Sequence, residues 1–269
     1  MAEEFPHYIE FRHVYKTFDK PVLVDSSFHV DVGQTVAIIG RSGVGKSVTL
    51  AHIMGFLHPD QGRVIVAHED VTDYTEAEMN RIRRKVTMVF QSGALFDSLT
   101  VAENILFSLE TRDDYDAKNK EDVVDGLLKM VDIAGARDAY PSDLSTGYRR
   151  AVAIARALAA QPQCVLYDEP TTMVDPIMSD QLTTLMLRLK KQLNLTSVVV
   201  THDLDLLHRV ADQVVFLSKG RVAFFGPPQE LYSSEDPDIH EFLELDKVIR
   251  GKLSKDSPFR TGLGVAEVG

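Results

Sequence analysis

The segment Gly40-Arg-Ser-Gly-Val-Gly-Lys-Ser47 has the spacing of a phosphate-binding loop. It follows an unbroken apolar and β-branched run at 35–39 and opens a helix-compatible stretch, Lys46 to Leu57. Glycines let backbone N–H groups approach phosphate oxygens, and a helix N-terminus adds partial positive charge. We expect Lys46 to reach the β- and γ-phosphates of a nucleotide and the Ser47 hydroxyl to bind Mg²⁺. The residues expected at the nucleotide are Gly40, Arg41, Ser42, Gly43, Val44, Gly45, Lys46, Ser47 and Val48.

Two acids end a second apolar run, Cys164-Val-Leu-Tyr-Asp168-Glu169. A carboxylate at the end of a parallel strand faces the crevice in which a nucleotide lies. Asp168 is expected to hold Mg²⁺ through water, and Glu169 to position or deprotonate the attacking water. A strand that ends in Asp-Glu is common, so this prediction depends on the phosphate loop elsewhere in the chain.

A third segment, Asp143-Leu-Ser-Thr-Gly-Tyr148, precedes a basic, alanine-rich stretch. It resembles the Leu-Ser-Gly-Gly-Gln signature of the ATP-binding cassette (ABC) family, and the resemblance covers roughly residues 8–235. It implies that the cofactors are ATP and Mg²⁺. It also implies that Ser145 and Gly147 bind the γ-phosphate of ATP held by a second copy, so that two ATP molecules lie between two copies related by a twofold axis.

The signature departs from the family pattern at Thr146 and Tyr148. Thr146 replaces a glycine, which is costly only if its backbone is left-handed. These two residues leave open the alternative that the protein binds ATP as a sensor and hydrolyses little of it. Glu169 and His202 match the family and favour hydrolysis.

Four more positions match the family one at a time. Gln91, in Met-Val-Phe-Gln, resembles the glutamine that reports Mg²⁺ and the γ-phosphate to the transporter. Asp175 ends Thr-Met-Val-Asp, where the family usually has Ser-Ala-Leu-Asp. His202 resembles the switch histidine at the γ-phosphate and, with Glu169, is expected to be catalytic. Phe18 stands where the family places an aromatic against adenine, although one aromatic in a strand is more often a core residue.

The pattern of elements predicts an α/β fold of the P-loop NTPase (RecA-like) type. Strands that alternate with helices imply a parallel sheet with right-handed crossovers. Short alternating strands over 8–32 predict an antiparallel β edge subdomain, and a helical subdomain at roughly 95–160 is inserted in the core. We expect one ATPase domain over 1–235 and a helical or flexible tail over 236–269.

The tail allows two interpretations. Asp236-Pro237 can cap and start a helix. An apolar face then follows, made of Phe242, Leu245, Ile249 and Leu253. The helix either packs on its own domain or forms an arm that docks on a second copy or a regulatory subunit.

Composition narrows the class of protein. The chain has 269 residues, a net charge of −11 and one cysteine, Cys164. The acidic balance argues against a nucleic-acid partner, which would require clustered Lys and Arg, and a single cysteine fits a reducing compartment. The N-terminus has acids where a signal peptide needs bases, and no apolar stretch approaches the ~18 residues of a membrane span. We expect a cytoplasmic protein.

The segment after Gln91, Ser92-Gly-Ala-Leu-Phe96, resembles the Mla/Mce branch, whose ATPases drive lipid transport between membranes. The implied partners are a second copy, integral membrane permease subunits and an Mce-domain lipid-binding protein. The subunit would lie on the inner face of the cytoplasmic membrane through the permease. Against this branch, its signatures are usually Leu-Ser-Gly-Gly-Met and Ala-Gly-Leu-Asp.

Two alternatives stay open. Importers of small polar solutes resemble this segment only from Leu95 onward, and soluble ABC ATPases act on DNA or ribosomes without a permease. A permease partner also predicts that apolar residues of segment 92–107 are exposed rather than filling the helical subdomain. These residues are Ala94, Leu95, Phe96, Leu99, Ile105 and Phe107.

Overall fold

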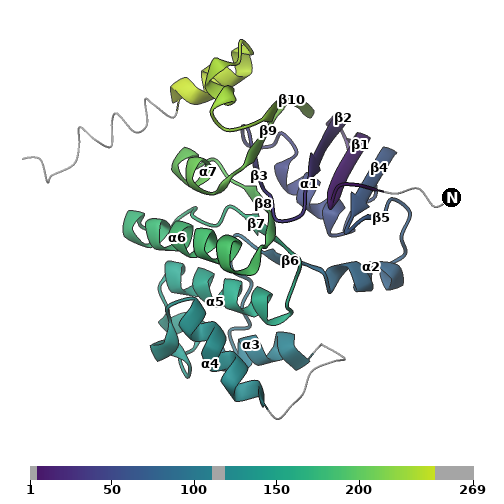
Figure 1. Ribbon diagram of the computed structural model, residues 1–269. Coiled ribbons are helices and arrows are strands. Elements are labelled where there is room, and N and C mark those ends of the chain that lie inside the picture. The colour runs from purple at the N-terminus through teal and green to yellow at the C-terminus, as the bar shows by residue number, and fades with distance from the viewer. Residues whose placement is uncertain (1–4, 111–118, 246–269) are drawn as a thin grey trace, which may run out of the picture.

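A six-stranded sheet of order β10-β9-β3-β8-β7-β6 forms the centre of the computed structural model, which describes residues 5–110 and 119–245 (Figure 1). Neighbouring strands from β9 to β6 are parallel, and β10 is antiparallel to β9. All residues of β3 and β8 are buried, as expected for β-branched strands covered on both faces. The strands are β3 (Thr35–Ile39), β6 (Val86–Val89), β7 (Cys164–Asp168), β8 (Thr196–Val200), β9 (Gln213–Ser218) and β10 (Arg221–Gly226).

A four-stranded antiparallel sheet of order β2-β1-β4-β5 stands beside the central sheet. It confirms the predicted antiparallel subdomain. Its core face packs with the first helix and with the central sheet, and the rings of Phe11 and Phe28 stack there at 4.7 Å. The elements are β1 (Ile9–Thr17), β2 (Pro21–Val30), β4 (Gln61–Val66), β5 (Glu69–Asp70), α1 (Lys46–Ile53) and α2 (Glu76–Arg83).

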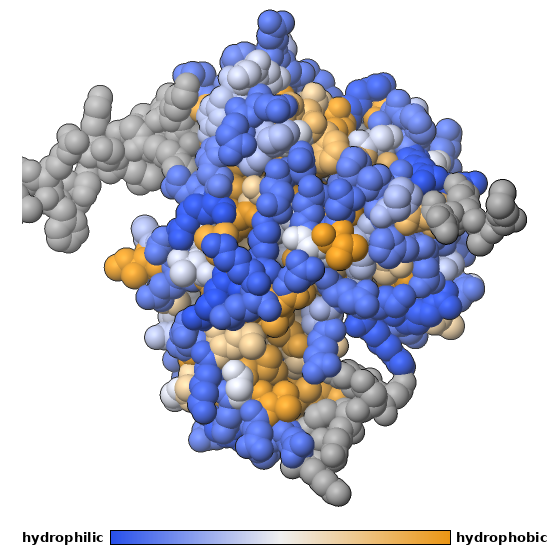
Figure 2. Space-filling view, in the orientation of Figure 1, coloured by the Kyte–Doolittle hydropathy of each residue, from blue (hydrophilic) through white to orange (hydrophobic). Residues whose placement is uncertain are grey.

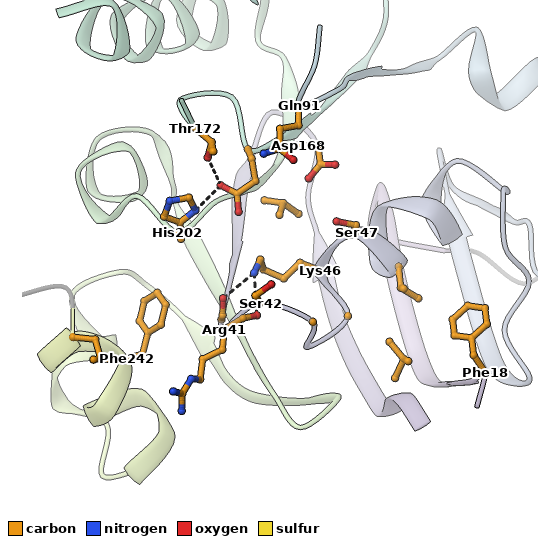
Figure 3. A pocket seen from close by; sticks show the side chains of 18 residues that line it. Phe18, Arg41, Ser42, Lys46, Ser47, Gln91, Asp168, Thr172, His202 and Phe242 are labelled. Atoms are coloured by element: carbon orange, nitrogen blue, oxygen red, sulfur yellow. Dashed lines mark hydrogen bonds and ion pairs between the residues drawn. The ribbon is translucent and has the colours of Figure 1, made fainter. Parts of the chain in front are cut away.

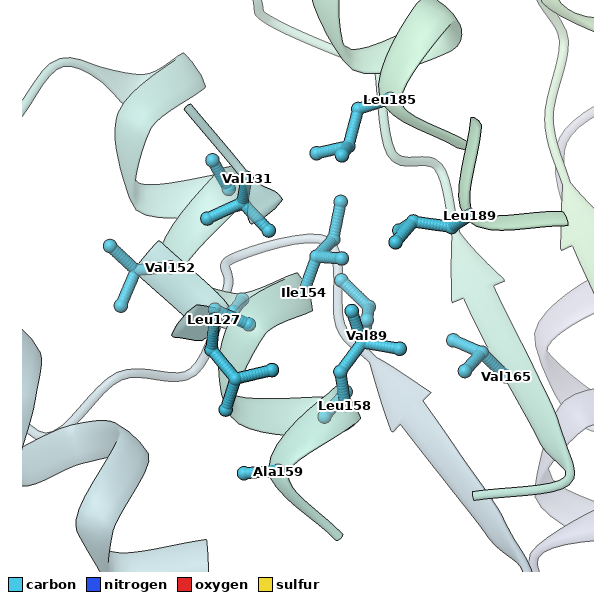
Figure 4. Close-up of a cluster of buried hydrophobic side chains, with 14 of the residues drawn as sticks. Val89, Leu127, Val131, Val152, Ile154, Leu158, Ala159, Val165, Leu185 and Leu189 are labelled. Atoms are coloured by element: carbon cyan, nitrogen blue, oxygen red, sulfur yellow. The ribbon is translucent and has the colours of Figure 1, made fainter. Parts of the chain in front are cut away.

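A helical block is inserted between β6 and β7, as predicted, and lies at one end of the molecule (Figure 1). Its helices share a hydrophobic cluster with the sheet and with α6, and Figure 4 shows Ile154 and Leu158 of the block facing Val89, Val165 and Leu189. Small alanine side chains on α5 allow this close packing. The helices of the block are α3 (Val101–Glu110), α4 (Lys120–Met130) and α5 (Thr146–Ala159). Outside the block, α6 (Pro176–Leu193) follows β7 and α7 (Leu204–Val210) follows β8.

Helix α6 starts at Pro176, because Asp175 caps it by accepting the N–H of Met178 at 3.0 Å. Leu193 is 44% exposed, since the helix stops there and Asn194 is left-handed. Among residues 5–110 and 119–245, no helix has the length and apolar character that crossing a membrane requires.

Buried Asn104 fixes the segment that joins β6 to α3. Its Oδ1 accepts the N–H of Phe96 at 2.9 Å, and its Nδ2 donates to the carbonyls of Phe96, Leu99 and Thr100 at 2.9–3.1 Å. Thr100 and Glu103 add reciprocal capping bonds at the start of α3. These bonds hold residues 96–100 in one conformation a few residues after Gln91.

The chain after residue 236 forms a helix over 237–245 that packs on the central sheet. Asp236 Oδ1 accepts the N–H of Ile239 at 3.3 Å and so caps the helix. Ile239 and Leu243 are buried in one cluster with Phe216 of β9. This part of the tail therefore completes the domain core.

The apolar face predicted for this helix differs from the buried one. Phe242 is partly buried, and Leu245 is 45% exposed. Ile249 and Leu253 lie outside the described residues. The buried stripe uses two residues that the prediction left out, because the helix meets the sheet through its first turns.

Candidate active site

Three chain segments meet at the carboxyl edge of the central sheet. The phosphate loop follows β3, Glu169 follows β7, and His202 follows β8. Strand β8 lies between β3 and β7 and pairs in parallel with both. The ends of parallel strands point to the same edge, so the three segments converge although about 160 residues separate the first from the last.

These segments line a cavity of about 950 Å³ (Figure 3). Most of the residues predicted from the sequence line it: Phe18, Gly40, Arg41, Ser42, Gly43, Gly45, Lys46, Ser47, Val48, Gln91, Asp168, Glu169 and His202. Four predicted residues do not: Val44, Ser145, Gly147 and Asp175. Five further residues complete the lining: Val22, Thr172, Val200, Phe242 and Leu245.

Two glycines of the phosphate loop have positive φ and little space for a side chain. Gly40 has φ 141°, and a Cβ there would lie 2.3 Å from the carbonyl oxygen of Leu217. Gly45 has φ 110°, and a Cβ there would lie 3.0 Å from the carbonyl oxygen of Val22. Both positions combine positive φ with close approach, which is the use of glycine in such loops. The loop thus wraps tightly and enters α1 at Lys46.

The Lys46 ammonium group lies over the loop. Its Nζ donates to the carbonyls of Gly40 at 2.8 Å and Arg41 at 3.1 Å. Burial lowers the pKa of Lys46, and the neighbouring Glu169 and Asp168 partly offset this. The side chain is therefore a half-buried cation next to a helix N-terminus, an arrangement that attracts phosphate.

Glu169 and His202 form an ion pair in which His202 Nδ1 lies 2.8 Å from Glu169 Oε2. The Thr172 hydroxyl donates to the same oxygen at 2.9 Å. Glu169 has φ 48° although it is not glycine, and its N–H is bonded to the carbonyl of Val200 at 2.9 Å. Left-handed backbone at a non-glycine residue is strained and occurs often at active sites. It turns this carboxylate toward His202.

The two acids at the end of β7 have opposite pKa shifts. Burial, with the adjacent Glu169 carboxylate, raises the pKa of Asp168. Burial also acts to raise the pKa of Glu169, but the bonds from His202 and Thr172 outweigh it and lower that pKa. Hydrogen bonds thus stabilise the ionised form of Glu169. A cation bound next to Asp168 would stabilise the ionised form of that residue.

Ser47, Gln91 and Asp168 offer hydroxyl, amide and carboxylate oxygens to one cavity. Mg²⁺ prefers such hard oxygen ligands and is held through a few protein groups together with phosphates and water. The donor set therefore fits Mg²⁺ bound with a nucleotide.

The far ends of the cavity carry aromatic rings. Phe18 lies in the turn after β1 and is 52% exposed, with Lys16 Nζ 5.7 Å from its ring centre. Phe242 enters from the tail helix and packs edge-on against Phe216 at 5.4 Å. Arg41 of the loop also pairs with Glu241 of this helix at 3.1 Å. Sequence reasoning missed the tail helix as a cavity wall, since no local motif indicates which strand it packs against.

The signature segment lies at the start of α5. Ser145 caps the helix by accepting the N–H of Tyr148 at 3.3 Å, and Thr146 is the first helical residue without left-handed backbone. The glycine that the family has at this position is thus not needed for conformation. A Cβ at Gly147 would lie 2.6 Å from Met178 of α6, so the small residue there allows α5 and α6 to approach.

Comparison with known proteins identifies the class. The family model described as ABC transporter matches residues 23–172, more than half of the chain. The chain belongs to the ABC transporter family as an ATP-binding subunit. Its cofactors are ATP and Mg²⁺, and its activity is ATP hydrolysis.

Two curated proteins are similar to this chain over most of its length. It is 35% identical over 254 residues to methionine import ATP-binding protein MetN 1 of Pseudomonas fluorescens, covering 92% of this chain and 76% of that protein. It is 41% identical over 221 residues to sulfate/thiosulfate import ATP-binding protein CysA of Synechocystis, covering 82% of this chain and 61% of that protein. The matched region thus spans only part of each relative's length.

Solved structures confirm the predicted fold class. CbiO1 from Clostridium perfringens, part of the ABC transporter complex cbiONQ, superposes with a TM-score of 0.79 at 25% identity over 93% of this chain and all of that chain. The ATP-binding cassette MJ0796, in a dimeric post-hydrolysis state bound to ADP and Pi, gives 0.75 at 29% identity over 82% of this chain and 98% of that chain.

The pair of Glu169 and His202 predicts a titration. The hydrogen bond that His202 donates to Glu169 raises the pKa of His202 above its usual 6.5, against burial. The stability that the raised pKa of His202 contributes is therefore complete below 6.5, and it is lost as the pH rises through that raised pKa. The contribution of Glu169 is lost at acid pH, as the pH falls through its lowered pKa and the carboxylate becomes protonated. Histidine ring signals followed by NMR in nucleotide-free protein should give His202 a pKa above 6.5, and Glu169→Gln should lower it. An unchanged pKa in the variant would contradict the pairing.

Proposed function

We propose that this chain powers the import of a small polar solute, working as two copies beneath membrane permease subunits. One observation carries the proposal: a single cavity holds the phosphate loop, Asp168, Glu169 and His202, in a chain whose relatives are named as import ATP-binding proteins. The alternative of a soluble ABC ATPase that acts on DNA or ribosomes has no comparable support.

The cavity residues divide the work of hydrolysis. Lys46 and the loop N–H groups bind the phosphates, and Phe18 stacks on adenine. Ser47, Gln91 and Asp168 hold Mg²⁺, which neutralises phosphate charge. Those residues bind and orient the nucleotide.

Glu169 is the general base. Its lowered pKa keeps it ionised, and its bond to His202 fixes its direction toward the attacking water. The same pairing raises the pKa of His202, which favours a protonated ring, and that charge would face the γ-phosphate as negative charge develops there.

The residues outside the cavity act on the second copy in this proposal. Ser145 and Gly147 open α5, and Asp175 caps α6, so backbone N–H groups at two helix N-termini are available to a phosphate from another chain. Met173 is 87% exposed and Ile177 74% exposed beside Asp175. Large apolar side chains this exposed are typical of a surface that another chain covers.

An exposed aromatic pair marks the surface proposed for the permease. Phe96 and Phe107 meet edge to face at 4.7 Å and are 43% and 48% exposed, with Arg156 over the Phe96 ring at 5.9 Å. Figure 2 shows hydrophobic side chains gathered over the helical block on a face that is otherwise mostly hydrophilic. The prediction that the apolar residues of segment 92–107 are exposed holds only for part of them. Ile105 is fully buried, and Leu95 packs against the core of the helical block.

The transported substrate would not touch this subunit, so its class is inferred from relatives and from segment 92–96. The named relatives import methionine and sulfate or thiosulfate, which favours a small polar solute over a lipid. Phospholipid transport, with an Mce-domain partner, is the second candidate. The segment Ser92-Gly-Ala-Leu-Phe96 favours it, because this sequence resembles the Mla/Mce branch.

Replacing Glu169 with Gln should separate binding from turnover. The variant keeps the shape and the Thr172 contact but loses the base, so ATP hydrolysis should fall by ~10²–10⁴ while ATP affinity is kept. Turnover should be measured with the partner membrane subunits present. Glu78→Gln is the control, because Glu78 lies in the α2 capping box and a glutamine can retain that role. Equal hydrolysis by wild type and Glu169→Gln would contradict the assignment of the base.

Replacing Phe96 with Asp should uncouple the subunit from its membrane partner. An aromatic at the centre of an interface typically contributes about 2 kcal/mol or more, so permease recovery in affinity purification should fall about tenfold or more, with nucleotide binding unchanged. Phe56→Asp is a matched control, since Phe56 is 53% exposed and has Arg83 over its ring at 5.0 Å. Equal loss in both variants would refute a specific surface.

The material recovered with the wild-type protein decides the substrate class. A permease with a soluble receptor for an amino acid or ion, and no enriched phospholipid by mass spectrometry, is the expected result. Enriched phospholipid with a lipid-binding partner would favour the second candidate. Ribosomes or DNA without a membrane protein would overturn transport.

A further inference from the structure

A histidine pair and an aspartate lie together on the antiparallel sheet, on residues that the hydrolysis site does not use. His7 precedes β1, His29 lies in β2, and Asp31 follows β2. One ligand atom from each can be chosen so that all three lie within 4.8 Å of one another. Within residues 5–110 and 119–245, this is the one such group of three among His, Cys, Asp and Glu side chains.

Direct contacts already organise the group. His7 Nδ1 lies 2.6 Å from Asp31 Oδ1. The rings of His7 and His29 stack at 3.9 Å with an interplanar angle of 22°. The His29 ring also contacts Phe225 of β10, and these two rings meet edge to face at 4.9 Å. A metal ion bound at this place would replace the contact between His7 and Asp31, with an atom of each residue as a ligand.

The backbone that carries these side chains is held by the sheet. The N–H of Tyr8 bonds to the carbonyl of Val30 at 2.9 Å, directly beside His7 and Asp31. Glu10 is the cross-strand partner of His29. The N–H of Asp31 bonds to Gln34 Oε1 at 3.1 Å. His29 lies on a paired strand, and His7 and Asp31 lie beside strand ends that these bonds hold in place.

Glu10 lies opposite His29 on the neighbouring strand. Glu10 is itself paired with Arg12 at 2.8 Å. The group therefore offers two imidazoles and one carboxylate, with Glu10 engaged elsewhere.

We propose that His7, His29 and Asp31 bind a divalent transition-metal ion of the zinc class, apart from the Mg²⁺ that accompanies ATP. Imidazole nitrogens favour Zn²⁺, Ni²⁺ and Cu²⁺ over Mg²⁺, which prefers oxygen ligands. Zinc–nitrogen bonds are about 2.0–2.1 Å long. The stacked rings must therefore tilt until both lone pairs point at one ion, and water completes the coordination. The ion would join the chain before β1 to β2.

Cobalt(II) is a suitable probe, because its visible absorption reports the number and type of its ligands. Nucleotide-free protein titrated with Co²⁺ should bind one equivalent at this group, and excess Mg²⁺ should not displace it. Loss of one of three ligands should weaken binding about tenfold or more. We expect this for His29→Ala, for the conservative His29→Gln and for Asp31→Asn, with ATP binding retained in each.

His13→Ala is the matched control. His13 Nδ1 lies 2.7 Å from Asp25 Oδ1, a histidine–aspartate pair of the same kind in the same sheet. Cobalt affinity should be unchanged in this variant. Three outcomes would overturn the proposal: affinity weaker than about 1 mM, binding unaffected by His29→Ala and Asp31→Asn, or binding that is lost in His202→Ala, which would place the ion in the nucleotide cavity. Because the readout is metal binding, its failure is independent of whether the chain powers transport.

Discussion

The parallel pairing of β8 with both β3 and β7 is the constraint on which the site depends. The register aligns Ile38 with Val200, and Val200 with Asp168, in one row across three strands. The phosphate loop starts within two residues of that row, and His202 and Glu169 also lie within two residues of it. A one-residue slip would turn each of these side chains to the other face of the sheet. The fully buried β-branched strands prevent such a slip, because it would break their packing on both faces.

Charged side chains of opposite sign lie together in this cavity, and each reduces the cost of burying its neighbours. Lys46 is a half-buried cation, and Asp168 and Glu169 are half-buried acids in the same cavity. Each would be costly alone, since burial opposes the charged form of every one. Together they set the chemistry: Glu169 is kept ionised by His202 and Thr172, Lys46 stays close to the loop carbonyls, and Asp168 is left to favour a cation. The same arrangement leaves strained backbone at Glu169.

Local motifs predicted most of the site, and tertiary packing explains the rest. The phosphate loop, the acids after β7 and His202 were predictable because each follows a short buried strand, and parallel strands bring such ends to one edge. The wall formed by Phe242 and Leu245 was not, because its position depends on which face of the tail helix meets the sheet. The group on the antiparallel sheet was also invisible. Its members are 22 and 24 residues from His7, and only the register of β1 and β2 joins them.

The claim that Lys46 holds nucleotide phosphates in this cavity is tested most directly by calorimetric titration of Mg-ATP into Lys46→Ala. A hydrogen bond to a charged group contributes about 1.5–3 kcal/mol, so ATP should bind about 10–100-fold more weakly than to wild type. Lys191→Ala, at an exposed lysine near the end of α6, should bind ATP as wild type does. Equal ATP affinity in wild type and Lys46→Ala would contradict the account, because the nucleotide would then be bound elsewhere.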